Sequence, residues 1–411
     1  MKMDDSCATS DLLTLEQALS QILSELPAID AYERVPLKHA LNRITYKAVH
    51  AAIDVPNFRN SSMDGYALRS IDKHSKVLNI IGTSWAGKPF TKPIADNECI
   101  RIFTGAYVPD QCDCVVMQEN VHRIDETIHL TQWPVEGENI RQVGDDTQKG
   151  QLLFAKGRSL QPADIGLLAS CGIADVAVFK KLNVGFFSTG DELVPIGSQT
   201  KPGQIFDSNR YTLHALLETA NITPTDLGVI PDDPIAIESA LIAASNACDV
   251  IITTGGASVG EADYIVDILK KMGRVHLWQI AIKPGKPLVF GSINETAFFG
   301  LPGNPVSVMV TFQQIVQPAL QTRAGLQQNQ TPITLQAKTA ETIKKQPGRT
   351  EFQRGFVENI NGELVVHSTG NQGSHIISSM SKANCLIVLE QYAANIEKGQ
   401  HVNIQLLTQS L

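Results

Sequence analysis

The chain opens with an amphipathic helical pattern. Apolar residues recur at helical spacing over positions 15–23, and Thr14 with Gln17 has the spacing of a capping box, in which two residues cap the first helical turn reciprocally. Pro27 cannot continue a helix, so we predict that this helix ends before it. A second short helix is predicted over residues 37–44.

The pattern changes between residues 53 and 146. Short apolar runs are separated there by Gly, Pro, Asn and Asp, which is typical of short strands joined by turns. The clearest runs are 77–81, 114–117 and 128–130. We therefore predict a mostly-β module. The next stretch, 151–178, has one helical segment near 163–169 and is predicted to be a connector.

From residue 182 to about 323, strand-like and helical patterns alternate. The predicted strands cover 184–188, 226–230, 250–254 and 276–282, and the predicted helices cover 211–220, 234–244 and 262–272. Such alternation favours a mostly parallel sheet covered by helices. In sheets of this kind, ligands bind in the loops at the carboxyl ends of the strands.

The remainder of the chain, 332–411, is rich in strand patterns and reads as a small β-barrel or sandwich. We predict an α/β multidomain fold with a central α/β domain, an inserted mostly-β module, a connector domain and a C-terminal β-barrel. The predicted limits are 1–26 for an N-terminal helix on the central domain, 27–52 plus 147–181 for the connector, 53–146 for the module, 182–328 for the α/β domain and 329–411 for the barrel.

Composition narrows the function classes. The 411 residues are 43% hydrophobic and 18% charged, which is ordinary for a globular protein. The formal net charge of −8 repels nucleic acid and anionic membranes, so we expect neither as a partner. Seven scattered cysteines without zinc-finger spacing indicate reduced thiols. The acidic, polar N-terminus and the lack of a long apolar run predict a cytoplasmic location.

The sharpest local motif is the glycine-rich segment 253–264. It follows an apolar strand pattern and leads into a helix, so its backbone N–H groups can form an anion site. A plain turn is the alternative, which the glycine density disfavours. The segment is neither a P-loop nor a dinucleotide-binding fingerprint. Asp263 either caps the helix or helps to hold a divalent cation.

Acidic loops follow the other strands of the same domain. Asp191 and Glu192 come directly after a strand, where two adjacent carboxylates are costly unless they are solvated or bound to a cation. Asp207 is interpreted as a helix cap, and Asp232–Asp233 precedes another helix. Any one of these is an ordinary feature. Because the loops converge at one edge of the sheet, we predict a shared crevice.

Two constrained basic or polar loops oppose the acids. KPGKP (283–287) offers two lysines to a phosphate or oxyanion, and LPGNPVS (301–307) opens a helix with Pro305 near its first position. Acids and lysines in one crevice suit a metal-bridged anion, as in phosphoryl transfer. No nucleophile motif is present, and the ten histidines are scattered.

The motifs together resemble a known family. The strings NSSMDGYA (60–67), TGA (104–106), GENIR (137–141), STGDEL (188–193), IFDSN (205–209), TTGGASVGEADY (253–264), KPGKP (283–287) and LPGNPVS (301–307) are similar, in order, to the MoeA family of molybdopterin molybdenumtransferases, which is related to the C-terminal domain of gephyrin. The resemblance spans residues 14 to about 390.

The resemblance implies an elongated homodimer whose cleft lies between the α/β domain of one subunit and the β module of the other. It implies transfer of molybdenum from molybdate to adenylylated molybdopterin with release of AMP, assisted by Mg²⁺ or another divalent cation. The upstream molybdopterin adenylyltransferase is an implied partner. Two alternatives remain open: the preceding ATP-dependent adenylylation, and a non-enzymatic scaffold.

Site residues follow from the resemblance motif by motif. The implied catalytic residues are Asp64, Thr104, Asp146, Glu192, Asp232 and Asp263, and the last three are the implied metal ligands. The implied substrate-binding residues are Arg141, Thr189, Gly190, Ser208, Gly255, Gly256, Ser258, Gly260, Lys283, Lys286, Pro302, Pro305, Ser307, Arg354 and Ser374. Within this set, Lys283, Arg354 and Ser374 are implied to hold molybdate.

Three positions depart from the family pattern. Arg59 stands where Asp is common, Gln111 and Cys112 replace a usual Gly-Ala, and Gln279 stands where some members have another lysine. None of these removes a motif residue, but the last leaves one cation fewer near the anion.

Overall fold

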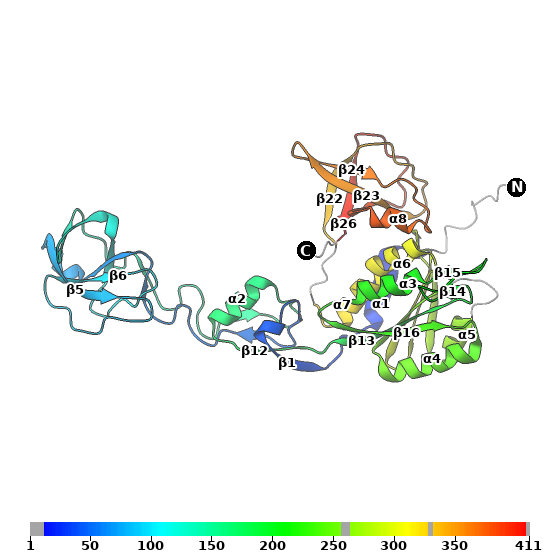
Figure 1. The fold of residues 1–411 in the computed structure, drawn as a ribbon, viewed down its shortest axis with the longest axis horizontal. Helices are drawn as coiled ribbons and strands as arrows, with labels where there is room; N and C mark the ends of the chain where they lie inside the picture. Colours follow the sequence, from blue (N-terminus) through cyan, green and yellow to red (C-terminus); the bar gives the residue numbers. More distant parts are fainter. Residues whose placement is uncertain (1–11, 256–263, 328–331, 408–411) are drawn as a thin grey trace.

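The computed structural model describes residues 12–255, 264–327 and 332–407. The chain is elongated (Figure 1): a β module lies at one end, a small connector lies in the middle, and an α/β domain with a C-terminal barrel forms the other end. The predicted fold class is thus confirmed. None of the helices within these described ranges is long and apolar enough to cross a membrane.

Helix α1 (Leu15–Glu25) forms where the pattern predicts it. Thr14 Oγ1 accepts the backbone N–H of Gln17, and the Gln17 side chain accepts the N–H of Thr14, so both halves of the capping box are present. Ala18 and Ile22 are fully buried in the core of the α/β domain. The helix therefore docks onto that domain, although the chain then leaves it for the connector.

The connector is built from small antiparallel pairs. Strand β1 (Tyr32–Pro36) pairs with β12 (Asp175–Phe179), and β2 (Val49–His50) pairs with β11 (Leu152–Phe154); helix α2 (Pro162–Ser170) packs beside them. The helix predicted over 37–44 is wrong. Only the 3-10 turn η1 (Leu37–His39) forms, because Asn42 adopts φ 60° and interrupts a helical path.

The β module contains a six-stranded sheet in the order β7-β4-β6-β5-β9-β8. Its strands are β4 (Gly65–Leu68), β5 (Val77–Ser84), β6 (Glu98–Ile102), β7 (Cys114–Met117), β8 (Val121–Ile124) and β9 (Thr127–Leu130). The short pair β3 (Asn60–Ser61) and β10 (Ile140–Arg141) lies outside this sheet. Apolar side chains of the module form two clusters, which include Ile100 in one and Leu78 in the other.

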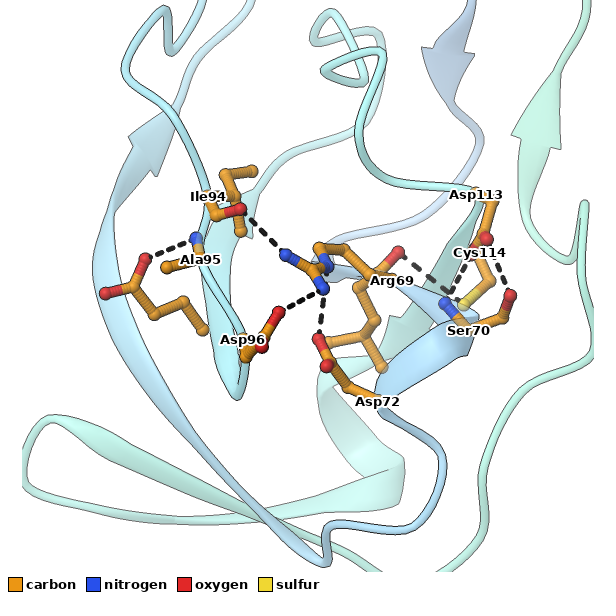
Figure 2. Close-up of polar contacts among 10 residues, drawn as sticks. Arg69, Ser70, Asp72, Ile94, Ala95, Asp96, Asp113 and Cys114 are labelled. Atoms are coloured by element: carbon orange, nitrogen blue, oxygen red, sulfur yellow. Dashed lines mark hydrogen bonds and ion pairs between the residues drawn. The ribbon is translucent and has the colours of Figure 1, made fainter.

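Polar contacts fix the 3-10 turn η2 (Ser70–Asp72) in this module (Figure 2). Arg69 donates to the Ile94 carbonyl at 2.9 Å and to Asp96 at 2.7 Å, and it lies 3.3 Å from Asp72. On the other side, the Asp113 carboxylate accepts the backbone N–H and the hydroxyl of Ser70 at 2.7 and 2.6 Å. The turn is thereby tied to the 94–96 loop and to the start of β7.

The α/β domain has a six-stranded sheet in the order β16-β13-β17-β21-β20-β18. The strands are β13 (Leu182–Thr189), β16 (Ile222–Ile230), β17 (Val250–Thr254), β18 (Arg274–Gln279), β20 (Pro287–Ile293) and β21 (Thr296–Leu301). The first four in that order are parallel. Strand β20 runs antiparallel to both of its neighbours, β21 and β18, so β18 has the direction of the first four and the sheet is mostly parallel as predicted. Helices α3 (Ser208–Leu217), α4 (Pro234–Ala247) and α5 (Tyr264–Met272) cover it, and α6 (Pro305–Thr311), the π-helical turn η4 (Phe312–Val316) and α7 (Gln317–Arg323) follow β21.

The predicted strand 276–282 is wrong in its extent. It divides into β18 and the short β19 (Ile282–Lys283), and β19 leaves the sheet to pair in parallel with β23 (Thr350–Ile360) of the C-terminal domain. Leu13 also pairs with Ile280, so the N-terminal segment reaches the same crossing point. This exchange joins the two domains through backbone hydrogen bonds.

The C-terminal domain is a closed barrel. Strands β23, β24 (Glu363–Ser368), β22 (Thr334–Thr339), β26 (His401–Leu406) and β25 (Cys385–Leu389) follow one another, and β25 pairs back onto β23. A short helix, α8 (Ile377–Ser381), faces α6 of the α/β domain. Closure decides in favour of the barrel over the sandwich.

Candidate functional site

The carboxyl ends of four neighbouring parallel strands lie at one edge of the sheet of the α/β domain, where the sequence predicts a crevice. Strand β13 lies between β16 and β17, and β21 follows β17. The loops that carry Glu192, Asp232, Gly255 and Pro302 leave these four ends. The sequence prediction that the loops share one edge of the sheet is therefore confirmed for the described residues.

Acidic side chains crowd one side of this edge. Asp191 Oδ1 accepts the backbone N–H of Asp232 at 3.3 Å. Burial, then the nearby charges of Asp191 and Glu192, raise the pKa of the Asp232 carboxyl above its ordinary value. The Glu192 carboxylate lies against Gly190, where an added Cβ would be 2.6 Å from Oε2. The Glu192 side chain could move aside, but the φ of 145° at Gly190 is a backbone conformation that other residues rarely adopt.

The third predicted metal ligand, Asp263, lies outside the described residues. Within the described ranges, no three His, Cys, Asp or Glu side chains form a group that could hold a metal ion. Gly256, Ser258 and Gly260 also lie outside the description. The described part of the glycine-rich segment includes Thr254, whose hydroxyl forms a hydrogen bond of 2.9 Å with the hydroxyl of Ser188.

Gly255 is required by its backbone and by its neighbour. Its φ is 86°, in the left-handed region, and a Cβ would lie 2.8 Å from the carbonyl oxygen of Thr189. Thr189 itself is 7% exposed at the end of β13. The two strand ends therefore approach closely, with Gly190 and Gly255 side by side at the crevice.

The loop before α3 joins the crevice to the 301–305 loop. Asp207 caps α3 by accepting the N–H of Arg210 at 3.1 Å, so its interpretation as a cap is confirmed. Ser208 is the first residue of the helix. The next residue, Asn209, donates to the Gly303 carbonyl at 2.7 Å. Asn209 belongs to the IFDSN string, but no local pattern marks it as a functional residue.

A second depression lies where β19 meets the barrel. A pocket of ≈ 390 Å³ is lined by Lys283 and Pro284 from the α/β domain and by barrel residues that include Glu351 and Arg354. The Lys283 ammonium lies 3.3 Å from Glu351 Oε1. Two predicted molybdate-binding residues, Lys283 and Arg354, thus line one pocket within a single chain.

Arg354 is the unusual residue of this pocket. Its side chain is 1% exposed, yet its hydrogen-bond partners are neutral: Ser379 Oγ at 3.0 Å and the carbonyls of Asn371 and Gly373 at 3.3 and 3.0 Å. Burial lowers the pKa of the guanidinium to about 10. No ion pair with a carboxylate is found for it among the described residues. A buried charge without a partner of opposite sign is costly to keep in the folded protein.

The other predicted oxyanion residues lie beside this pocket without lining it. Ser374 accepts the backbone N–H of Val306 at 3.0 Å through its carbonyl, so its loop contacts the start of α6. Ser307 is buried in the first turn of that helix, which begins at Pro305 as predicted. Lys286, in the same loop as Lys283, has an exposed side chain.

A separate cluster forms in the β module. Asp64 Oδ1 accepts both the backbone N–H and the hydroxyl of Thr104 at 2.8 Å each. These bonds, with help from the charge of Arg101, keep the pKa of the Asp64 carboxyl below its ordinary value. Arg141 pairs with Asn60 across β10 and β3 and has an exposed side chain.

Asp146 lies at the base of the module, where its backbone N–H donates to Val55 at 3.0 Å and its side chain is exposed. Two of the unusual sequence positions meet nearer the sheet: Arg59 donates to the carbonyls of Pro109 and Cys112 at 3.1 and 2.9 Å. Arg59 therefore supports the loop that contains the altered Gln111–Cys112 pair, and it does not enter the Asp64 cluster by any bond in the structure.

The module residues and the crevice residues do not meet in one chain. Figure 1 shows the module at the far end of the molecule from the α/β domain, with the connector between them. The sequence motifs thus divide into two groups of functional candidates. Asp64, Thr104, Arg141 and Asp146 form the module group, and the remaining described candidates belong to the α/β domain and the barrel.

Comparisons with known families cover most of the chain. The MoeA N-terminal region, comprising domains I and II, matches residues 13–172. A family described as a probable molybdopterin binding domain matches residues 185–322, and the MoeA C-terminal region, domain IV, matches residues 336–407.

Individual proteins agree with these matches. The chain is 45% identical to a molybdopterin molybdenumtransferase of Haemophilus influenzae, over 96% of this chain and 98% of that protein. It is 34% identical to gephyrin of Dictyostelium discoideum, over 97% of this chain and 62% of gephyrin. Among solved structures, a molybdopterin biosynthesis MoeA protein from Pyrococcus horikoshii superposes with a TM-score of 0.84 at 30% identity, covering 97% of this chain and all of that one.

Proposed function

Because this chain belongs to the MoeA family of molybdopterin molybdenumtransferases, enzymes of molybdenum cofactor biosynthesis, we propose that it carries out the last assembly step. In this step, molybdenum passes from molybdate to adenylylated molybdopterin, AMP is released, and molybdenum cofactor is formed. The dithiolene sulfurs belong to the substrate. The six described cysteines are buried free thiols, in keeping with chemistry that needs no protein sulfur.

The buried Arg354 carries this proposal. Its guanidinium has only neutral partners, and Lys283 supplies a second cation to the same pocket. A tetrahedral dianion offers several oxygens to such donors, and charge-assisted bonds of this kind are about twice as strong as neutral ones. We assign this pocket to molybdate, with Ser374 and Ser307 at its edge.

The crevice at the strand ends is assigned to the adenylylated pterin. The glycine-rich segment, by its sequence pattern of a strand followed by glycines and a helix, suits a phosphate. The pyrophosphate then lies between this edge and the 283–287 loop. The residues assigned to it are Thr189, Gly190, Ser208, Gly255, Lys286, Pro302 and Pro305, together with Gly256, Ser258 and Gly260 outside the described ranges.

Glu192 and Asp232, with Asp263, are assigned to a divalent cation such as Mg²⁺. Burial and then the charges of Asp191 and Glu192 raise the pKa of the Asp232 carboxyl, and a bound cation would offset both effects. When bound, such a cation polarises the phosphoanhydride that joins AMP to the pterin phosphate. The protein groups orient the substrate: Gly190 and Gly255 leave room for it, and Lys283 holds the second substrate beside it.

We assign a homodimer to the protein because one chain keeps its two groups of candidate residues apart. In a symmetric dimer, the module of one protomer completes the crevice of its partner, and each interface is used twice. Asp64 with Thr104, Arg141 and Asp146 would then face the α/β domain of the other protomer. As part of the same proposal, the enzyme is cytoplasmic and receives its substrate from a molybdopterin adenylyltransferase.

AMP release tests the proposal. The purified chain is incubated with adenylylated molybdopterin and Mg²⁺, with and without molybdate, and AMP is quantified. We expect release that depends on molybdate, and loss of that dependence in the Arg354→Gln variant. Tight binding of the pterin without any release, or a requirement for ATP in place of the adenylylated pterin, would overturn the assignment.

A further inference from the structure

A buried carboxylate forms one wall of the proposed molybdate pocket. Glu351 is the second residue of β23 and stands opposite Lys283 in the parallel pairing of β19 with β23. Its side chain is 5% exposed, whereas that of Lys283 is 48% exposed, and the ammonium lies 3.3 Å from Oε1. The pair therefore spans the join between the α/β domain and the barrel.

The carboxylate is held from the barrel side as well. Its second oxygen accepts the side-chain amide of Gln353 at 3.0 Å, and that amide also donates to the Lys344 carbonyl at 2.9 Å. Lys345 is buried nearby, with its ammonium donating to the carbonyls of Gln346 and Gln391. Glu351 is thus fixed in position before any ligand arrives.

A negative charge in the wall of an anion pocket needs a reason. By Coulomb's law alone, a carboxylate beside a bound dianion weakens binding, and burying it adds a desolvation cost. A lysine, in contrast, is a flexible point charge that loses conformational freedom when it binds a ligand. A fixed partner removes part of that loss in advance.

We propose that Glu351 is a positioning residue that holds the Lys283 ammonium in the oxyanion pocket that Lys283 lines. The inference rests on the proposed function, because it takes the ligand to be a tetrahedral dianion such as molybdate. The β19–β23 pairing sets the two side chains opposite each other, and the Gln353 amide keeps the carboxylate from turning away. Lys283 then meets the oxyanion already oriented.

The Glu351→Gln variant tests the proposal with a prediction of definite sign. Gln retains the shape and can still bond to Gln353, but it lacks the charge that holds the ammonium. We expect the KM for molybdate to rise by about tenfold or more, the size of one lost charged hydrogen bond, while the KM for adenylylated molybdopterin stays within about twofold. Glu351→Asp should weaken molybdate binding less than Gln does.

Glu341 provides the matched control. It lines the same pocket, is exposed, and accepts the backbone N–H of Ser368 at 2.8 Å, but it has no bond to Lys283 in the structure. Glu341→Gln should lower the KM for molybdate, because it removes a repulsive charge and no positioning contact. If Glu351→Gln also lowers the KM, Glu351 acts only as a repulsive charge and the proposal is wrong.

A double-mutant cycle separates positioning from a general structural role. In the Lys283→Met background, Glu351→Gln should no longer raise the molybdate KM, because the contact that it breaks is already absent and only its repulsive charge is removed. Equal effects in both backgrounds, or a fall in melting temperature with an unchanged molybdate KM, would refute the proposal. Direct titration of each variant with molybdate by calorimetry gives the same comparison without turnover.

The same experiments distinguish this inference from the proposed function. If the unmodified protein releases AMP without any dependence on molybdate, the transferase assignment fails and the inference fails with it. If release depends on molybdate and the Glu351→Gln variant matches the unmodified protein in KM, the inference alone fails.

Discussion

Exchange of subunits between two inactive variants tests the shared cleft. We expect Asp64→Asn to disable the β module, because the neutral side chain no longer offers a carboxylate to the Thr104 N–H and hydroxyl. We expect Lys283→Met to disable the α/β domain by removing a cation from the proposed oxyanion pocket. Each residue lies at its own end of the elongated chain (Figure 1). If each cleft takes its two halves from different protomers, mixing the variants must restore activity.

The size of the recovery follows from the geometry. Random exchange makes about half of the dimers mixed, and a twofold axis gives each dimer two equivalent clefts. In a mixed dimer, one cleft combines both substitutions and the other combines neither. About one quarter of all clefts are then intact, so the mixture should regain about 25% of the unmodified activity.

Molybdate-dependent AMP release before and after exchange gives the measurement. A protomer that carries both substitutions serves as the control when it is mixed with unmodified protein in equal amounts. Clefts shared between protomers leave only the unmodified homodimers active, about one quarter, whereas clefts within one chain leave about one half. No recovery in the first mixture together with one half in the second would refute the shared cleft.

Three further predictions concern single positions. The pKa of Asp64 is lowered, so its contribution to the stability of the folded protein is present above the ordinary value of 3.8 and is lost as pH falls through the folded-state value. Thr104→Ala should raise the pKa of Asp64 toward 3.8, and NMR titration of the carboxyl measures this shift. The pKa shift of Asp232 has the opposite sign, so its favourable contribution to stability is lost as pH rises. Asp232→Asn should therefore raise the melting temperature at pH 7 without divalent cation. It should also reduce the increase in melting temperature that Mg²⁺ produces. Gly255→Ala forces a Cβ to within 2.8 Å of the Thr189 carbonyl at a φ of 86° and should lower the free energy of unfolding by about 1–3 kcal/mol in urea titrations, while the KM for the pterin substrate rises; unchanged values would show that the strand ends can separate.

Local patterns predicted the features that depend on short stretches of sequence. The capping box at Thr14 and Gln17, the cap at Asp207 and the start of α6 at Pro305 all form as expected, because each depends on residues within one helical turn. The convergence of the acidic loops was also predictable, since parallel strands place their carboxyl ends on one edge.

Long-range pairings were beyond such reasoning. The strand predicted over 276–282 divides because β19 pairs with β23, and the bond between Lys283 and Glu351 joins positions 68 apart in the sequence. Glu351 stands three residues before Arg354 in the same EFQRG string, yet nothing local shows that it faces a lysine. The separation of the β module from the crevice likewise depends on how the connector extends, which the residue pattern does not encode.

The two candidate centres keep charges of opposite sign in surroundings that disfavour them, negative at the strand ends and positive in the pocket. This difference in sign matches the ligand proposed for each centre. At the strand ends, burial and then the charges of Asp191 and Glu192 raise the pKa of Asp232; in the pocket, burial lowers the pKa of Arg354. Each shift is the cost of keeping a charge where its surroundings disfavour it, and each is relieved by a ligand of the opposite sign. Structural ion pairs would instead cancel within the protein, as those of Arg158 with Asp164 and Arg210 with Asp226 do. We therefore propose that the uncancelled charges mark the places where a cation and an oxyanion bind, and that the buried Glu351 holds Lys283 in place at the second of them.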